Sequence, residues 1–257
     1  MEDKKGKISV VINTYNARNH LERVLKAVEG FDEVVVCDME STDDTVAIAK
    51  RHGCRVVTFE KKDYVSAEPA RTFAIQSARC EWVLVVDADE IVTPQLRTYL
   101  YEAISKPDCA QGLYLPRKNF FMGRFMHSNY PDYVLRFFVK EGTVWPPYVH
   151  TLPTVKGRTE RISSRNKDLA LVHLADDSIQ TIVAKTNLYT ENEIEKKGRK
   201  RYGVGALLWR TFFRFFKSYV LKGGFRDGKE GFICACYEGL YQFVAVSKII
   251  EHRKRHQ

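Results

Sequence analysis

The sequence predicts an α/β fold: a mostly parallel sheet flanked by helices, followed by a helical region. Three observations lead to this class. Strand-like apolar segments alternate with helix-like periodicity over the first 105 residues, as in strand–helix–strand units. The apolar run at 82–86, rich in Val, is typical of a strand buried on both faces. After Pro107 short strand-like segments replace the alternation, and from Ser178 onward the pattern is helical.

The first half of the chain contains four predicted strands, at 8–12, 33–37, 55–59 and 82–86. Between the first two, apolar residues recur at helical spacing from Leu21 to Val28. Ser41 with Asp44 three residues later indicates a capped helix that runs to Gly53. A helix is expected at 68–79, and Thr93 followed by proline predicts the start of another.

The second half is predicted to be β-rich and then helical. Strands are expected at 112–116, 133–140, 143–149 and 169–174, with Glu141-Gly142 as a hairpin signal between two of them. Helices follow from Ser178, with breaks near Gly198 and Gly223-Gly224. We therefore expect an α/β domain over 1–177, with halves 1–106 and 107–177, and a helical region over 178–257.

Three acids end the buried strand at 82–86: Asp87, Asp89 and Glu90. Unpaired charge is costly in a core, so these carboxylates are expected at the sheet edge, where ligands of open α/β sheets bind. Asp87 and Asp89 are two residues apart and would share one side of an extended segment. Such oxygen ligands suit Mg²⁺ or Mn²⁺. The alternative is a solvated strand end with a cluster that caps a helix.

The four turns after the predicted parallel strands should meet at one edge of the sheet. They supply hydroxyls, carboxylates and an arginine together with the possible cation, a set that a nucleotide diphosphate requires. Neither a Gly-x-Gly-x-x-Gly nor a Walker A sequence is present, which argues against dinucleotide binding and a P-loop. The turn residues are Asn13 to Asn16, Asp38 with Ser41 to Asp43, Glu68 to Arg71, and Asp87 to Asp89.

Composition favours a chain from a reducing compartment. The six cysteines show no Cys-x-x-Cys or His-paired zinc spacing, so free thiols are expected rather than disulfides. The first residues lack an apolar signal-peptide core, and no run of 18 apolar residues indicates a transmembrane helix.

One segment holds the whole basic excess of the chain. Residues 196–226 contain ten Lys or Arg and no acid, which leaves 31 of the 41 basic residues against 32 acidic ones elsewhere. Arg210, Arg214 and Lys217 form one stripe of a helix. Beside it lies a broad apolar stripe, which is typical of a helix in a membrane interface. The apolar residues are Leu208, Trp209, Phe212, Phe213, Phe215, Phe216 and Val220.

The other interpretation of this segment is a core-packing helix with a solvated basic edge. Nucleic acid is disfavoured as a partner, because the aromatics lie on a helix among leucines rather than on a sheet as stacking platforms.

These residues carry a resemblance to a known family. The chain resembles family 2 glycosyltransferases of GT-A fold over nearly its whole length, and is most similar to the bacterial lipopolysaccharide-core and cell-surface glycan branch of beta-1,4-glucosyltransferase type. The resemblance rests on the turns at 11–16, 38–45 and 68–71, the Asp87-Ala88-Asp89-Glu90 motif, and the segments 130–132, 135–136 and 149–150.

The resemblance implies an inverting hexosyltransferase that uses a UDP-sugar and a saccharide or lipid-linked acceptor. The metal would be held by Asp89, with Asp87 at the ribose or the metal. Asp132 would be the general base, with a turn aspartate as the alternative, and His150 a metal ligand, a phosphate contact or a buried histidine. We expect His173, inside an apolar strand, to be structural. The donor would contact Thr14, Tyr15, Asn16, Asp38, Ser41 and Arg71.

The resemblance and the basic segment at 196–226 together imply a place for the enzyme in the cell. It would lie on the cytoplasmic face of the inner membrane and act in lipopolysaccharide or envelope glycan synthesis. The competing class is a non-catalytic module that binds anions or nucleic acid. Asp87 and Asp89 argue against that module, because a phosphate-binding surface gains nothing from two carboxylates unless a cation bridges them to the phosphate.

Overall fold

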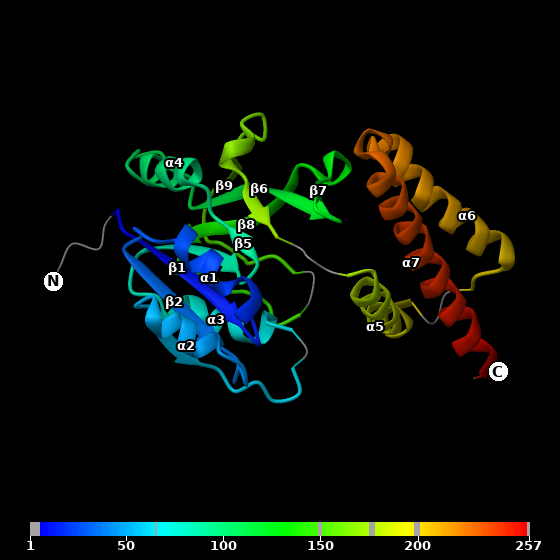
Figure 1. Ribbon diagram of the computed structural model, residues 1–257, viewed down its shortest axis with the longest axis horizontal. Helices are drawn as coiled ribbons and strands as arrows, with labels where there is room; N and C mark the ends of the chain where they lie inside the picture. Colours follow the sequence, from blue (N-terminus) through cyan, green and yellow to red (C-terminus); the bar gives the residue numbers. More distant parts are fainter. Residues whose placement is uncertain (1–5, 65, 149–150, 175–177, 198–200, 256–257) are drawn as a thin grey trace. The chain divides into compact units, whose positions relative to one another are not determined.

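The computed structural model describes residues 6–64, 66–148, 151–174, 178–197 and 201–255. The chain divides into two compact units (Figure 1). The first comprises residues 1–118 and 131–174 and contains the sheet. The second comprises residues 119–130 and 175–257 and is mainly helical.

The sheet of the first unit begins with four parallel strands in the order β3-β2-β1-β4. The order continues as β8-β6-β10-β5, in which β8 runs antiparallel to β4 and to β6. The predicted α/β class, parallel half first and β-rich half second, is confirmed. The strands are β1 Ile8–Thr14, β2 Glu33–Asp38, β3 Arg55–Thr58, β4 Trp82–Asp87, β5 Glu90–Ile91, β6 Gly112–Phe121, β8 Asp132–Val139, β9 Thr159–Arg161 and β10 Leu171–His173.

Helices cover both faces of the parallel strands. Alternate residues of each strand point to opposite faces, so β1 sends Val10 and Ile12 to one core and Val11 to the other. The first core takes side chains from α1 (Arg18–Ala27), α2 (Thr45–Arg51) and α4 (Pro94–Ile104). The second takes them from α3 (Glu68–Ser77) and includes Trp145. A short 3₁₀ turn, Lys167–Leu169, precedes β10.

The register of the parallel strands brings their polar ends together. Thr14 at the end of β1 pairs with Asp38 at the end of β2. On the other side of β1, Asn13 pairs with Asp87 at the end of β4. The predicted convergence of these turns at one edge therefore follows from the register.

The strand predicted at 143–149 is wrong. Within 143–148 the backbone forms no strand; it has a single bridge, between Val144 and Thr154, and bends at 147–148. Pro146 and Pro147 explain this, since neither has an N–H to donate to a neighbouring strand. The hairpin predicted at Glu141-Gly142 is therefore only a turn.

One predicted helix cap is confirmed and one is wrong. Thr93 caps α4, because its Oγ1 accepts a hydrogen bond from the backbone N of Leu96 at 3.1 Å. At the start of α2, Ser41 does not cap; its hydroxyl donates to Asp38 instead, at 2.6 Å. The N-cap residue of α2 is Asp44, which makes no capping hydrogen bond through its side chain, while Oδ1 of Asp43 accepts from the backbone N of Thr45 at 3.0 Å.

The second unit is built on an antiparallel pair of helices, one of which also packs against a third helix. α6 (Val204–Phe216) continues into a π-helical turn, Lys217–Leu221, and α7 (Gly228–Arg255) packs against both α6 and α5 (Ile179–Lys197). Gly223 ends the turn with a φ of 73°, at the predicted break. A 3₁₀ turn at Gly224–Asp227 leads into α7.

Residues 119–130 are fastened to these helices by a buried carboxylate. Asp227 is fully buried and accepts from the backbone N atoms of His127 at 2.9 Å and Ser128 at 3.0 Å. These two residues lie in the 3₁₀ turn His127–Asn129, after the short strand β7 (Arg124–Phe125). The arrangement explains why this excursion belongs to the helical unit.

Close packing at the start of α7 requires glycine. A Cβ built on Gly231 would lie 2.0 Å from the carbonyl oxygen of Gly224, so no other residue fits there without movement of the backbone. Along α6, Phe215 packs edge-on against Phe232 of α7 at a centroid distance of 5.7 Å. Phe215, which belongs to the apolar stripe predicted for this helix, therefore contacts α7.

Among the described residues, one helix, Gly224–Arg255, is long and apolar enough to cross a membrane by length and composition alone. Core helices of globular proteins pass the same test, and this helix packs against α5 and α6. All six cysteines are free, as the sequence predicts.

Candidate active site

The turns after β1 and β2 are joined by Asp38, which is 2% exposed. Its Oδ1 accepts from the hydroxyls of Thr14 at 2.9 Å and Ser41 at 2.6 Å, and its Oδ2 accepts from the Ser41 backbone N at 2.8 Å. Asn16 extends the link, because its Oδ1 accepts from the backbone N of Thr42 at 2.8 Å. These hydrogen bonds therefore hold the turns after β1 and β2 in a fixed arrangement.

Tyr15, which follows Thr14 in the chain, is exposed over 47% of its surface. The Lys61 ammonium lies 4.6 Å from the centre of its ring. The neighbouring turns contain strained backbone, with φ at +49° for Asn16 and +60° for Glu40. An exposed ring beside a cation offers a stacking surface for a flat or anionic group.

Asp87 is held by two arginines from different elements. Nη2 of Arg71, on α3, donates to its Oδ1 at 2.8 Å, and Nη2 of Arg136, on β8, donates to its Oδ2. Burial alone would raise the pKa of Asp87, but the guanidinium groups of Arg136 and Arg71 outweigh burial and hold that pKa well below its usual range. Asp87 is therefore a carboxylate at neutral pH.

Trp145 covers both arginines. Their Cζ atoms lie 4.6 Å (Arg71) and 5.3 Å (Arg136) from its ring, and its backbone is anchored by the Thr72 hydroxyl. Each arginine is 6% exposed, yet several of the N–H groups in this cluster have no hydrogen-bond partner. Buried donors without acceptors are costly. The unpaired atoms are Nε and Nη1 of Arg71, Nη1 of Arg136 and Nε1 of Trp145.

Asp89 has a different partner from Asp87. Its Oδ2 lies 3.3 Å from Nε2 of His173, which belongs to β10. The carboxylate is 39% exposed and the imidazole 23% exposed, so both are accessible from solvent. Among the described residues, no group of three or more His, Cys, Asp or Glu side chains is arranged as a metal site.

A buried ion-pair network adjoins this pair. Glu90 is fully buried, and its Oε2 accepts from the backbone N of Asp87 at 2.9 Å. Arg117 of β6 bridges two carboxylates: Nη1 donates to Glu90 at 3.1 Å, and Nη2 and Nε donate to Oδ2 of Asp132 at 2.6 and 2.9 Å. Asp132 at the start of β8 is thereby held at the same edge as Asp87.

The structure brings the predicted residues of the first unit to one edge of the sheet, with the exception of His150, which lies outside the described residues. Sequence reasoning assigned no role to Arg117, Arg136 or Trp145, and it interpreted His173 as structural. The sequence offered one signal, since Arg136 lies in the segment 135–136, on which the family resemblance partly rests. The spacing of residues in the sequence could not reveal which carboxylate each cation contacts.

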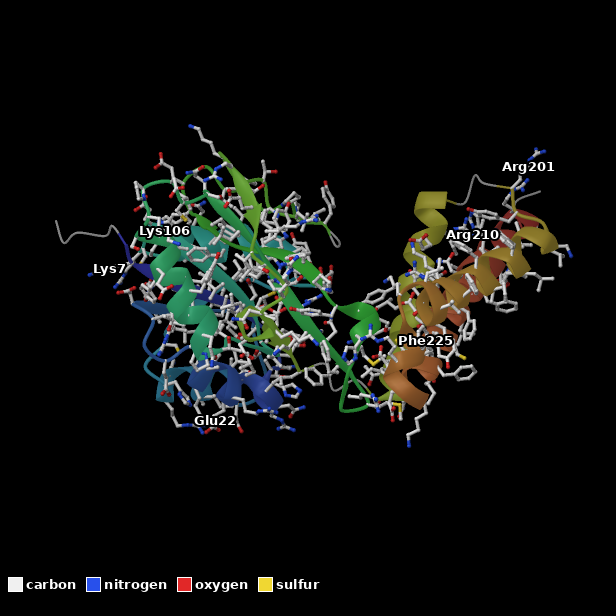
Figure 2. All side chains as sticks on the ribbon, turned by 90° about the horizontal axis from the view of Figure 1, so that it is seen from above. Lys7, Glu22, Lys106, Arg201, Arg210 and Phe225 are labelled. Atoms are coloured by element: carbon white, nitrogen blue, oxygen red, sulfur yellow. The ribbon has the colours of Figure 1, made fainter. Side chains whose placement is uncertain are left out.

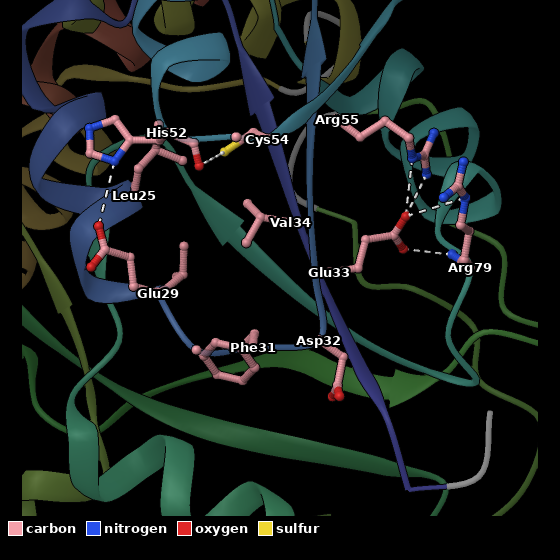
Figure 3. A pocket seen from close by; sticks show the side chains of 13 residues that line it. Leu25, Glu29, Phe31, Asp32, Glu33, Val34, His52, Cys54, Arg55 and Arg79 are labelled. Carbon is pink, nitrogen blue, oxygen red and sulfur yellow. Dashed lines mark hydrogen bonds and ion pairs between the residues drawn. The ribbon is translucent and has the colours of Figure 1, made fainter. Parts of the chain in front are cut away.

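A cavity of about 360 Å³ lies elsewhere, at the amino ends of β2 and β3 (Figure 3). Its polar residues are already paired: Glu33 contacts Arg55 at 3.0 Å and Arg79 at 3.8 Å, and Glu29 lies 3.6 Å from His52. Ligands of open α/β sheets bind at the carboxyl ends of strands. The cluster around Asp87 is therefore the better candidate site.

Several known proteins similar to this chain are described as glycosyltransferases. An uncharacterised glycosyltransferase of Rickettsia conorii is 29% identical over 95% of this chain and 90% of its own length. The lipopolysaccharide core biosynthesis glycosyltransferase LpsC of Rhizobium meliloti is 23% identical over 95% of this chain and 92% of its own length.

Among solved structures, glucosyl-3-phosphoglycerate synthase of Mycobacterium tuberculosis, crystallised with Mn²⁺, uridine diphosphate and glucosyl-3-phosphoglycerate, is 27% identical with a TM-score of 0.37. The likeness covers 44% of each chain, which is less than half of either.

The model of glycosyl transferase family 2 matches residues 9–160. This range is more than half of the chain. It contains the Asp38 turn, the arginine pair on Asp87, and Asp89, Glu90 and Asp132. The resemblance drawn from the sequence motifs is thus confirmed: the chain belongs to glycosyl transferase family 2.

Proposed function

We propose that this protein is an inverting glycosyltransferase that moves a hexose from a UDP-sugar to a saccharide or lipid-linked acceptor in lipopolysaccharide or envelope glycan synthesis. The observation that carries the proposal is the cluster at Asp87, where two buried arginines share one carboxylate and retain unpaired donors. Such donors suit an anionic ligand such as a nucleotide diphosphate. The similarity to LpsC supports the envelope glycan assignment.

The donor would lie over the turns of β1 and β2. Tyr15 and Asn16 are the accessible groups there, whereas Thr14, Asp38 and Ser41 hold the turns in place through their hydrogen bonds. Arg71 would face the diphosphate, with Asp87 fixing its direction. In this arrangement the uridine contacts the exposed ring and the phosphates approach the arginine cluster.

Mg²⁺ or Mn²⁺ fits the donor set at the same edge. The carboxylate of Asp89 and the imidazole of His173 are side by side and accessible, and diphosphate oxygens can complete the coordination. Asp87 already pairs with two arginines, so Asp89 is the better proposed ligand of the metal. A bound divalent cation supplies charge neutralisation for a departing diphosphate.

Asp132 is the proposed general base. The acceptor hydroxyl would lose its proton to this carboxylate as its oxygen attacks the anomeric carbon, and the bond to the diphosphate would break in the same step. Arg117 holds Asp132 in position through two hydrogen bonds to its Oδ2. We expect this contact to lengthen when acceptor binds, so that the carboxylate can accept the proton.

Residues 1–177 would form the catalytic domain and 178–257 a helical region peripheral to the cytoplasmic face of the inner membrane. The exposed apolar residues of α6, among them Leu208, Trp209 and Phe212, support this location, as does the basic excess of 196–226.

A donor-hydrolysis screen tests the function. The purified chain is incubated with UDP- and GDP-sugars in the presence of Mg²⁺ or Mn²⁺ and without acceptor, and nucleotide release is measured. We expect slow release from a UDP-hexose that EDTA abolishes. The absence of release from every donor, together with binding of UDP that is indifferent to metal, would instead favour a non-catalytic anion-binding module.

A further inference from the structure

The helical unit contains a groove between α6 and α7 with a volume of about 380 Å³. The two helices also approach closely: a Cβ on Gly239 of α7 would lie 3.2 Å from the carbonyl oxygen of Thr211 on α6. Figure 2 shows the side chains of this unit, with Arg210 labelled on α6 and Phe225 in the turn before α7. The lining residues are Trp209, Arg210, Phe213, Arg214, Lys217 and Gln242.

The groove and its continuation toward Lys222 carry excess positive charge. Arg210, Arg214, Lys217 and Lys222 line it, against a single carboxylate, Glu238. That carboxylate is occupied, since it accepts from Nε of Arg214 at 2.6 Å. Three of the four cations therefore lack a counter-charge from the lining residues.

The hydrogen bonds of these cations are incomplete as well. Arg210 donates to Oε1 of Gln242 at 3.3 Å, while its buried Nε has no partner. In the part of the chain that the structure describes, no carboxylate pairs with Lys217 or Lys222. The groove thus offers N–H donors and positive charge to an anion from outside.

An apolar surface adjoins the groove. The outward side of α6 exposes large side chains, and Trp209 and Phe213 belong both to it and to the groove wall. Exposure of several contiguous large apolar residues marks an interaction surface. Their exposed fractions are 61% for Leu208, 64% for Trp209, 60% for Phe212, 43% for Phe213, 36% for Phe216 and 42% for Val220.

We propose that this groove binds the phosphate of an anionic phospholipid headgroup while the apolar outer side of α6 enters the acyl region of the bilayer. The inference rests on the peripheral location proposed above and deepens it by naming the lipid group and the residues that select it. Arginine and lysine on the flank of an interfacial helix lie at the depth of the headgroups, where charge-assisted hydrogen bonds to phosphate form.

The charge of the groove favours a lipid over the other candidate occupants. A second copy of the chain would bring the same unpaired cations against each other, which is repulsive. A free phosphate would use the cations but leave the apolar outer side in water. An anionic bilayer satisfies the cations and the apolar side chains together.

Vesicle co-sedimentation of the full-length chain tests the proposal. The test variant is Lys217→Gln with Lys222→Gln, which removes two exposed charges that have no carboxylate partner and therefore should not disturb folding. The matched control is Lys50→Gln with Lys106→Gln, which removes two exposed lysines of the first unit. The probes are phosphatidylcholine vesicles with and without phosphatidylglycerol.

On vesicles with phosphatidylglycerol, we expect the test variant to bind about 30-fold more weakly than wild type at low salt, and the control to bind as wild type does. On phosphatidylcholine alone, binding should be weak and equal for the three proteins. The double variant Leu208→Ser, Phe212→Ser should bind both vesicle types more weakly, because it removes the apolar contribution.

Three results would overturn the proposal: equal pelleting of the test variant and wild type on anionic vesicles, no pelleting of wild type, or a wild-type dimer that excludes vesicles. Displacement by glycerol phosphate at the same phosphate concentration would also contradict it and indicate a site for soluble phosphate. Donor hydrolysis without vesicles should be equal for all variants. This readout therefore separates a failure of the lipid-binding proposal from a failure of the proposed glycosyltransferase activity.

Discussion

Nε2 of His173 lies 3.3 Å from Oδ2 of Asp89, although the two residues are far apart in the sequence. Asp87, only two positions from Asp89, contacts Arg71 and Arg136 instead. The two aspartates therefore have separate partners, and their substitutions should have different consequences.

Asp89→Ala should abolish metal-dependent binding of UDP and leave the fold intact. The carboxylate is 39% exposed and its partner within the described residues is one histidine, so little stability depends on it. Glu81→Ala is the matched control, because Glu81 is an exposed acid just before the other end of β4. Calorimetry with UDP and Mn²⁺ measures the effect; an affinity equal to that of wild type would show that Asp89 is not a ligand.

The apo protein should lose stability as the pH rises through the titration of His173. Burial of the ring would lower its pKa, but the hydrogen bond with Asp89 and the charge of Asp89 prevail and raise the pKa above 6.5. A raised folded-state pKa stabilises the fold at pH values below the unfolded value, and this contribution disappears above the folded one.

The measurement is urea unfolding in EDTA from about pH 6 to about pH 8. The His173→Asn variant should show a flatter pH dependence than wild type. Parallel curves for the two proteins would mean that the pair does not titrate as described.

Asp132→Asn should lower sugar transfer by about 10² or more, the usual size of a general-base contribution, with donor affinity little changed. The amide keeps an oxygen that can accept from Arg117, so the substitution removes charge without removing the contact. Steady-state kinetics with saturating donor measures the loss. Turnover near that of wild type would remove Asp132 from the mechanism and direct attention to His150.

Glu90→Ala should destabilise the first unit by about 3–5 kcal/mol, the usual cost of removing one partner from a buried ion pair. Glu90 is fully buried and contacts both Arg117 and the backbone N of Asp87, which would be left without it. Glu22→Ala breaks an exposed pair with Lys26 and should change stability little. Equal unfolding midpoints in urea for the two variants would contradict this account of the network.

The sequence by itself determined the parallel half of the sheet and the edge at which its turns meet. This was possible because strand and helix periodicity are local, and the register of parallel strands brings their polar ends together. Thr14, Asp38 and Asp87 were predicted at one edge and are found there. The two faces of α6 were also readable from helical spacing, although the contact of Phe215 with α7 was not.

Only the tertiary structure decided which cation meets which acid. Arg117, Arg136 and His173 arrive on β6, β8 and β10, whose antiparallel pairing brings distant parts of the chain together. Spacing in the sequence does not encode such long-range contacts. The chain also turns after Asp87, so two aspartates expected on one side of a strand face different partners. The physical reason is that the residue pattern determines which side chains share one face of a helix or strand, whereas tertiary packing determines which residues that face contacts.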